Sequence, residues 1–320
     1  MANTTTKLRV VYGDGTLGVI GTDVQYIFSY ERGGLESLVT NGQEWLYQVP
    51  RPALWRATTD NDRGNQFSTK AAMWLGADLF SRCQQMNVAV DGVDLGTPIA
   101  PQNNRYSDHE WADQVAVTCT FRTATVPATT ITVTYVVTAS DGLTVTAHYT
   151  GHQNLPELPA FGLRFVMPTA AESFTYRGLS GETYPDRMAG GQGGEHRVVG
   201  LPVTPYLVPQ EMGMNMKTTK VTVTRTDQLN NAGSLTKPGR LAVEQVTAPF
   251  AFSCLPYTPA ELENATHIEE LPVARRTVLT VFGAVRGVGG IDSWGADVQP
   301  DYRISSQVDH EVSIRIHPGR

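Results

Sequence analysis

Short runs of alternating apolar and polar residues, rich in valine and threonine, recur along the chain. Such alternation predicts β-strands that bury one face and expose the other. The clearest runs are LRVVY, VQYIFSY, QVAVTCTF, TITVTYVVT, LTVTAHY, KVTVTRT, TVLTVFGAV and VSIRIH. The turn residues SDG at 140–142 separate two of these runs. That spacing predicts a β-hairpin.

Helical periodicity is confined to two stretches, STKAAMWLGADLF at 68–80 and TPAELENATH at 258–267. In the second, Thr258 is placed as an N-cap, Pro259 takes the first helical position, and Glu261 completes a capping box. No fixed-period repeat interrupts the pattern. We therefore predict an all-β chain, a large antiparallel β-sandwich of two packed sheets with one or two short helices and long loops.

Composition narrows the classes of function. The chain has 320 residues, 41% of them hydrophobic, and a formal net charge of -6. No run of lysine and arginine forms a basic patch, which argues against nucleic acid as a partner. Three widely separated cysteines predict no disulfide framework. We expect a cytoplasmic protein without membrane association, because the first residues lack an apolar signal region and no apolar run is as long as a membrane span.

A polar cluster stands out in WRATTDNDRG, residues 55–64. An EF-hand calcium loop that began at Asp60 would need glycine in the sixth position and glutamate in the twelfth. Here glycine falls in the fifth position and Ala71 in the twelfth. The residues instead favour a turn, in which aspartate and asparagine bond to nearby backbone and Gly64 allows positive φ.

Two other loops carry candidate chemistry. RGLSGETYPDR at 177–187 contains Glu182, but glycosidase chemistry needs two carboxyl groups at one bond, and no partner is evident. An ordinary turn is the favoured alternative. In GVGGIDSWGADV at 287–298, Trp294 either packs in the core or presents its ring to a sugar. The seven histidines form no metal-ligand set, so we predict no metal site.

Four stretches taken together resemble one family. They are WRATTDNDRG, GETYPDR, TPYLVPQEMGMN (204–215) and GGIDSWGADV. In this order they are similar to motifs of the C-terminal domain of the large β-galactosidases of glycoside hydrolase family 2. The resemblance covers roughly residues 22 to 316, which we take as one domain (22–320) that follows an N-terminal segment and first strand (1–21). The chain is also close in length to the small subunit of two-chain β-galactosidases.

The resemblance implies a galactose-mutarotase-like supersandwich and the hydrolysis of terminal β-galactosides such as lactose, with retention. It places both catalytic glutamates on a barrel domain in a large subunit. We therefore expect no catalytic residue in this chain, and a heterodimer with that large subunit as partner. The resemblance implies no cofactor bound by this chain, although Mg²⁺ and Na⁺ serve the assembled enzymes.

Site residues follow from the motif matches. Trp294 matches a tryptophan that walls the substrate pocket and packs against sugar, and Asp292 lies beside it in the same motif. Gly64 matches a glycine that begins a mobile loop at the pocket mouth. Asp60, Asn61 and Asp62 match the run before that loop, and we expect them to order its base. The chain departs from the family at Met212 and Ile291, where asparagine and aspartate are usual.

Two other functions remain open at this stage. A free-standing module could bind galactose through Trp294 on its loop. A mutarotase-like enzyme could use a histidine and a glutamate as acid and base on the sugar oxygens, with His148, His196 and Glu182 as candidates.

Overall fold

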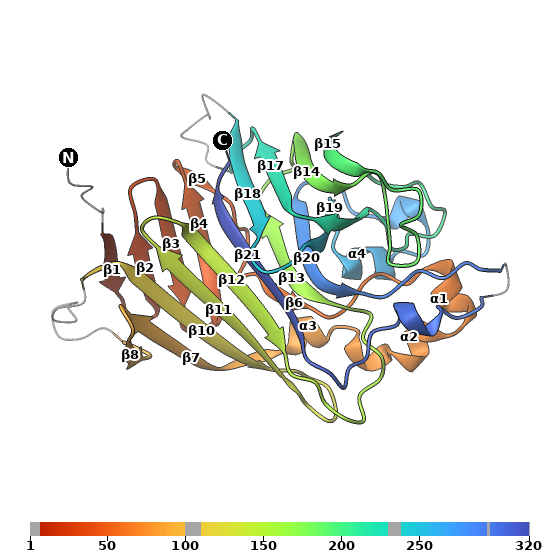
Figure 1. Ribbon diagram of the computed structural model, residues 1–320, viewed down its shortest axis with the longest axis horizontal. Helices are drawn as coiled ribbons and strands as arrows, with labels where there is room; N and C mark the ends of the chain where they lie inside the picture. The colour runs from red at the N-terminus through yellow and green to blue at the C-terminus, as the bar shows by residue number, and fades with distance from the viewer. Residues whose placement is uncertain (1–6, 100–109, 230–237, 293–294, 320) are drawn as a thin grey trace.

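The computed structural model describes residues 7–99, 110–229, 238–292 and 295–319, which form three antiparallel sheets (Figure 1). The six-stranded sheet has the order β5 (Gln43–Glu44), β4 (Gly34–Thr40), β3 (Val24–Ser29), β2 (Thr16–Ile20), β1 (Leu8–Tyr12), β9 (Trp111–Ala112). The ten-stranded sheet has the order β15 (Gly193–Val199), β14 (Ser173–Leu179), β17 (Lys220–Arg225), β18 (Gly239–Gln245), β21 (His310–Pro318), β12 (Gly142–Tyr149), β11 (Thr130–Thr138), β10 (Gln114–Arg122), β7 (Arg82–Val90), β8 (Val93–Gly96). The five-stranded sheet has the order β16 (Met214–Thr218), β19 (Phe250–Leu255), β20 (Thr277–Val285), β13 (Ala160–Met167), β6 (Arg51–Ala53).

The predicted class is confirmed, since the chain is a large antiparallel β-sandwich, but the described residues form three sheets and not the two that were expected. All eight alternating runs become strands, namely β1, β3, β10, β11, β12, β17, β20 and β21. Burial alternates residue by residue along β10, β11 and β12, as expected for strands that bury one face. The predicted hairpin joins β11 to β12, with Thr138 paired to Gly142 beside the turn.

One main core lies between the ten-stranded sheet and the two smaller sheets. Phe28 of β3 meets Tyr135 of β11 edge to face, with ring centroids 5.4 Å apart. Further along the ten-stranded sheet, β12 and β21 contact β13, and β21 also contacts β20. β1 and β2 extend the six-stranded sheet, and the domain boundary expected after residue 21 stays a prediction.

The helices are short. They are α1 (Asp60–Gly64), α2 (Phe67–Lys70), α3 (Ala77–Phe80) and α4 (Pro259–Asn264), with 3₁₀ turns at Ala72–Trp74, Ile268–Glu270 and Pro300–Tyr302. α4 has the predicted Thr258 cap, Pro259 start and Glu261 capping box. The expected single helix over 68–80 is wrong. It is broken into separate turns, because Gly76 takes a left-handed conformation (φ +74°) that a continuous helix excludes.

The five-stranded sheet is covered on both faces, since every residue of β13 and of β19 is buried. One face of this sheet packs against the main core. The other face is covered by loops and short helices, which form two small apolar clusters with it. One cluster contains Tyr184, Met214 and Phe282, and the other contains Ala57, Met212 and Leu255. Met212, a departure from the family motif, is thus a buried packing residue. No helix in the described ranges is long and apolar enough to cross a membrane.

Candidate functional site

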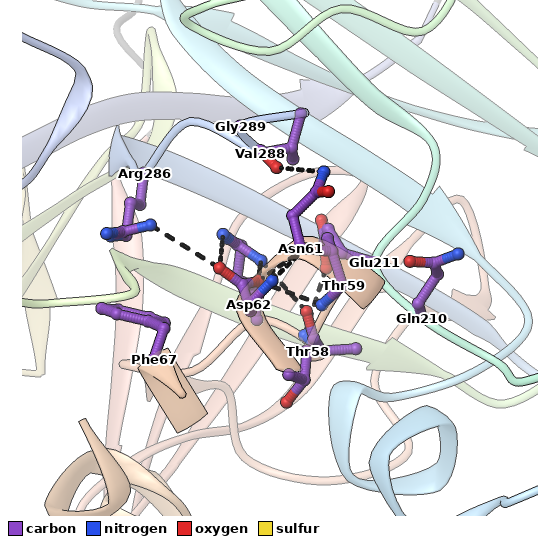
Figure 2. Close-up of polar contacts among 12 residues, drawn as sticks. Thr58, Thr59, Asn61, Asp62, Phe67, Gln210, Glu211, Arg286, Val288 and Gly289 are labelled. Atoms are coloured by element: carbon purple, nitrogen blue, oxygen red, sulfur yellow. Dashed lines mark hydrogen bonds and ion pairs between the residues drawn. The ribbon is translucent and has the colours of Figure 1, made fainter. Parts of the chain in front are cut away.

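The four stretches singled out in the sequence meet on this covered face of the five-stranded sheet. The first stretch bonds to the third, because the Asp60 amide donates to Gln210 Oε1 (2.8 Å). It also reaches the loop of the fourth, because Asn61 Nδ2 donates to the carbonyl of Val288 (3.0 Å), the residue just before GGIDSWGADV (Figure 2). The second stretch joins the third where the Thr183 amide donates to the Met214 carbonyl (2.8 Å). Residues remote in sequence therefore build one site.

Residues 60–64 form a capped helical turn. The Thr59 hydroxyl accepts a hydrogen bond from the Asp62 amide (3.1 Å), and the Asp62 carboxylate accepts one from the Thr59 amide (3.0 Å). This reciprocal arrangement is a capping box. The expected open turn with positive φ at Gly64 is wrong, because Gly64 is the last residue of the helix.

Asp62 lies between two buried arginines. Its carboxylate receives two bonds from Arg56, Nη1 to Oδ2 at 2.6 Å and Nη2 to Oδ1 at 3.3 Å. On the other side, Arg286 Nη1 is 3.6 Å from Oδ1 (Figure 2). Burial alone would raise the pKa of Asp62, but the charge and hydrogen bonds of Arg56 hold it below its usual range. Asp62 is therefore an ionised structural group.

Arg286 connects this helix to the loop that follows β20. Its Nη2 donates to Asp297 Oδ1 (2.6 Å), and Arg303 pairs with the same carboxylate (3.2 Å). Burial opposes the ionisation of Asp297, but the hydrogen bond and charge of Arg286 leave its pKa lowered. The guanidinium also lies over the Phe67 ring, 3.8 Å from its centroid. Arg286 thus positions both ends of the loop that carries GGIDSWGADV.

Asp186 holds the start of that loop. Its two carboxylate oxygens accept from the amides of Val288 (3.1 Å) and Gly289 (2.8 Å). The Arg187 side chain donates to the Gly289 carbonyl. A Cβ on Gly287 would lie 2.7 Å from Asp186 Cγ, so only glycine fits beside this carboxylate. Asp186 and Arg187 of GETYPDR therefore anchor the fourth stretch.

The far end of the loop returns to α1. A Cβ on Gly295 would lie 2.6 Å from both Cα and the carbonyl carbon of Gly64. Gly295 also has φ +82°. Asn65 Nδ2 adds a long contact to Asp297 Oδ1 (3.4 Å). The two glycines therefore set how closely the loop approaches the helix.

Glu211 is a buried acid beneath α1. Its carboxylate accepts a hydrogen bond from the Ala57 amide (3.2 Å). Burial raises its pKa to about 7, and the charge of Arg56 opposes that rise only in part. Nearby Tyr184 is also buried, and its hydroxyl has no hydrogen-bond partner among the described residues.

The expected site residues have different environments. Asp62 is buried, Asn61 is half-buried, and Asp60 is exposed beside Arg63, to which it is paired at 2.8 Å. Exposed Asp292 accepts a hydrogen bond from the Ala296 amide (3.0 Å). Trp294 lies outside the described residues.

Five residues of this site were not predicted from the sequence, namely Arg56, Asp186, Glu211, Arg286 and Asp297. All five lie inside or beside the four stretches, and a charged residue that becomes buried is usually paired, which was the available signal. Within the described ranges, no three histidine, cysteine, aspartate or glutamate side chains gather to hold a metal ion.

Comparison with known proteins gives the relatives of this chain. It is 57% identical to the β-galactosidase small subunit of Latilactobacillus sakei, over 99% of each chain. It is 33% identical to a β-galactosidase of Halalkalibacterium halodurans, over 97% of this chain but only 28% of that longer protein. A putative aldose 1-epimerase from Escherichia coli K12 is similar in structure, with a TM-score of 0.42 and 12% identity over 98% of this chain and 99% of that one.

A family model described as the β-galactosidase small chain matches residues 20–316. That range contains every strand from β3 to β20, all four stretches of the site and most of β21. The chain therefore belongs to the β-galactosidase small chain family.

Proposed function

We propose that this chain is the obligatory small subunit of a two-chain β-galactosidase, and that it completes the substrate pocket of a large subunit. Retaining hydrolysis needs two carboxyl groups about 5–5.5 Å apart across one glycosidic bond. In this proposal the large subunit supplies both. The supporting observation is the 57% identity to a small subunit over nearly the whole of both chains. The substrates are terminal β-galactosides such as lactose.

The pocket wall is the edge formed by α1 and the loop at 287–298. Trp294 and Asp292 would contact the sugar, and Asp60, Asn61, Asp62 and Gly64 would order the base of the adjoining loop. The network around Asp62 supports this assignment, because it holds α1 and the loop in one arrangement. A binding wall presented to another chain must be rigid before docking.

The first test is an assay of β-galactoside hydrolysis with this chain alone, its large-subunit partner alone, and the two mixed. Activity in the mixture only is the expected result. Titration of the large subunit with this chain should saturate at a fixed ratio. Hydrolysis by this chain alone would overturn the proposal, because a complete carboxylate pair would then lie here. Full activity of the large subunit alone would equally overturn an obligatory role.

A further inference from the structure

An exposed apolar segment lies next to the site. Leu75, Leu79 and Phe80 are 51%, 60% and 71% exposed. They lie within and just before α3 (Ala77–Phe80), whose place in the fold Figure 1 shows. Their neighbours fix the segment in place, since Trp74 Nε1 donates to the Pro156 carbonyl (3.1 Å) and Asp78 pairs with Arg164 (2.6 Å). Apolar side chains that are clustered, exposed and rigidly held are typical of a surface that another molecule covers.

A pocket of about 290 Å³ opens on one side of this segment. It lies between α3 and α4, and its lining includes Trp55, Leu79, Phe80, Pro259 and Ala260. The charged residues of the lining are Arg51, Arg164, Asp78 and Glu263, two of each sign, and Arg164 is paired with Asp78. An apolar side chain therefore fits this pocket better than an ion does.

A broader hollow lies on the other side, and Leu79 and Phe80 line it too. Its charged residues are Arg32, Arg51, Arg82, Arg122 and a single acid, Glu31. Arg82 and Arg122 are both exposed and lie directly opposite each other in the pairing of β7 with β10. Like charges in that position repel each other. Arg32 is paired with Glu36 (3.3 Å), so it is the facing pair of Arg82 and Arg122 that calls for carboxylates from a partner, in a chain of net charge -6.

The pocket adjoins the proposed site through Glu263. The Glu263 carboxylate, which lines the pocket, accepts hydrogen bonds from Trp55 Nε1 (3.3 Å) and the Thr58 amide (2.8 Å). Trp55 is the first residue of the stretch WRATTDNDRG, and α1 begins within the same stretch, directly after Thr59. A segment seated here would lie beside the edge that the proposed function presents to the large subunit.

We propose that Leu75, Leu79, Phe80, Arg82 and Arg122, here called the α3 face, dock a segment of the large subunit. That segment places an apolar side chain in the pocket beside Trp55 and carboxylates against the two arginines. The inference rests on the proposed function and names the surface through which the two chains assemble. Longer relatives support this partner, since a stretch matching this chain makes up only 28% of the Halalkalibacterium halodurans protein.

The test measures the dissociation constant between the purified large subunit and variants of this chain. Phe80→Asp should raise that constant at least about tenfold, as expected for a central apolar anchor. Val199→Asp is the matched control, because Val199 is 78% exposed on β15, and it should bind as the wild type does. Both variants should keep the wild-type melting temperature, since each changes an exposed side chain.

The double variant Arg82→Glu/Arg122→Glu tests the electrostatic part. It should weaken binding most at low salt, and added salt, which weakens the wild-type pair, should strengthen binding of this variant, because carboxylates would then face carboxylates. With either the Phe80 or the arginine variant in saturating excess, the turnover number should equal that of the wild type, because the α3 face serves assembly and not chemistry.

Three outcomes would overturn the inference. If the wild-type mixture is active and Phe80→Asp binds equally tightly, the α3 face is not the docking surface, although the proposed function stands. If wild-type chains neither bind nor hydrolyse in mixture, the proposed function fails together with the inference. If sedimentation of this chain alone shows a dimer that Phe80→Asp abolishes while large-subunit binding is unchanged, a second copy covers the face instead.

Discussion

Arg56 and Asp62 form a buried ion pair inside one stretch of the sequence, with Nη1 and Oδ2 2.6 Å apart and both side chains 1% exposed. The same guanidinium donates to the Gly287 carbonyl (2.9 Å), at the start of the loop that carries Asp292 and Trp294. The pair therefore connects the helical turn to the loop as well as stabilising the turn. This connection between α1 and the loop is what relates the ion pair to the proposed function.

Removal of the Asp62 charge should strongly destabilise the chain. Asp62→Asn leaves Arg56 buried without its carboxylate, which typically costs about 3–5 kcal/mol of unfolding free energy. Chemical denaturation of the isolated chain measures this loss. Asp60→Asn is the control, because the Asp60 side chain is 73% exposed and its surface pair should contribute less than about 1 kcal/mol. Equal losses in the two variants would contradict the assigned role of Asp62.

The fold could be predicted from the sequence because strand alternation and helix capping are local. β10, β11 and β12 follow from their two-residue period, and α4 follows from Thr258, Pro259 and Glu261. The contact of Arg286 with Asp62 could not be predicted in this way. It depends on which strands become neighbours in the five-stranded sheet, and the order of those strands is set by packing over the whole chain.

Within the site, the residue types were predictable but their roles were not. The Asp60–Gly64 run was expected to be a turn, and α1 is instead a helical turn because Thr59 and Asp62 satisfy each other's amides. The resemblance to a known family placed Asp292 and Trp294 near this run. Only the structure adds Asp186, whose carboxylate holds two amides of the loop.

Close packing of the loop on α1 predicts that Gly295 cannot be replaced. Gly295→Ala would meet the Gly64 backbone at 2.6 Å and would also strain a residue with φ +82°. We expect kcat/KM of the mixed subunits to fall at least about tenfold, a change of about 1.4 kcal/mol. Gly200→Ala is the control, since Gly200 has φ +71° with nothing within 4 Å of its added Cβ. It shares the backbone strain and lacks the clash, so kcat/KM should be unchanged.

The proposed sugar contact of Trp294 predicts a change in hydrolysis without a change in assembly. Trp294→Ala should lower kcat/KM about tenfold, because an aromatic contact contributes about 0.5–1.5 kcal/mol beyond its buried area. Its dissociation constant for the large subunit should stay at the wild-type value. Trp111→Ala serves as the control, because Trp111 is 57% exposed on the short strand β9. Normal kinetics in Trp294→Ala would remove this residue from the pocket.

Burial of Glu211 predicts a stability that depends on pH. Its pKa is raised from the ordinary 4.5 to about 7 in the folded chain, so the folded state keeps a proton that the unfolded state releases. This contribution is fully present below pH 4.5 and is lost as the pH rises through about 7. Glu211→Gln cannot ionise and should lose this dependence.

The Gln variant should therefore gain stability relative to the wild type above pH 7, by on the order of 3 kcal/mol. Its carbonyl oxygen can still accept the Ala57 amide, so the local geometry should be preserved. Denaturation curves from acidic to alkaline pH measure the difference, with Glu269→Gln as an exposed control that should follow the wild type. A constant difference between Glu211→Gln and wild type at every pH would mean that Glu211 does not titrate in this range.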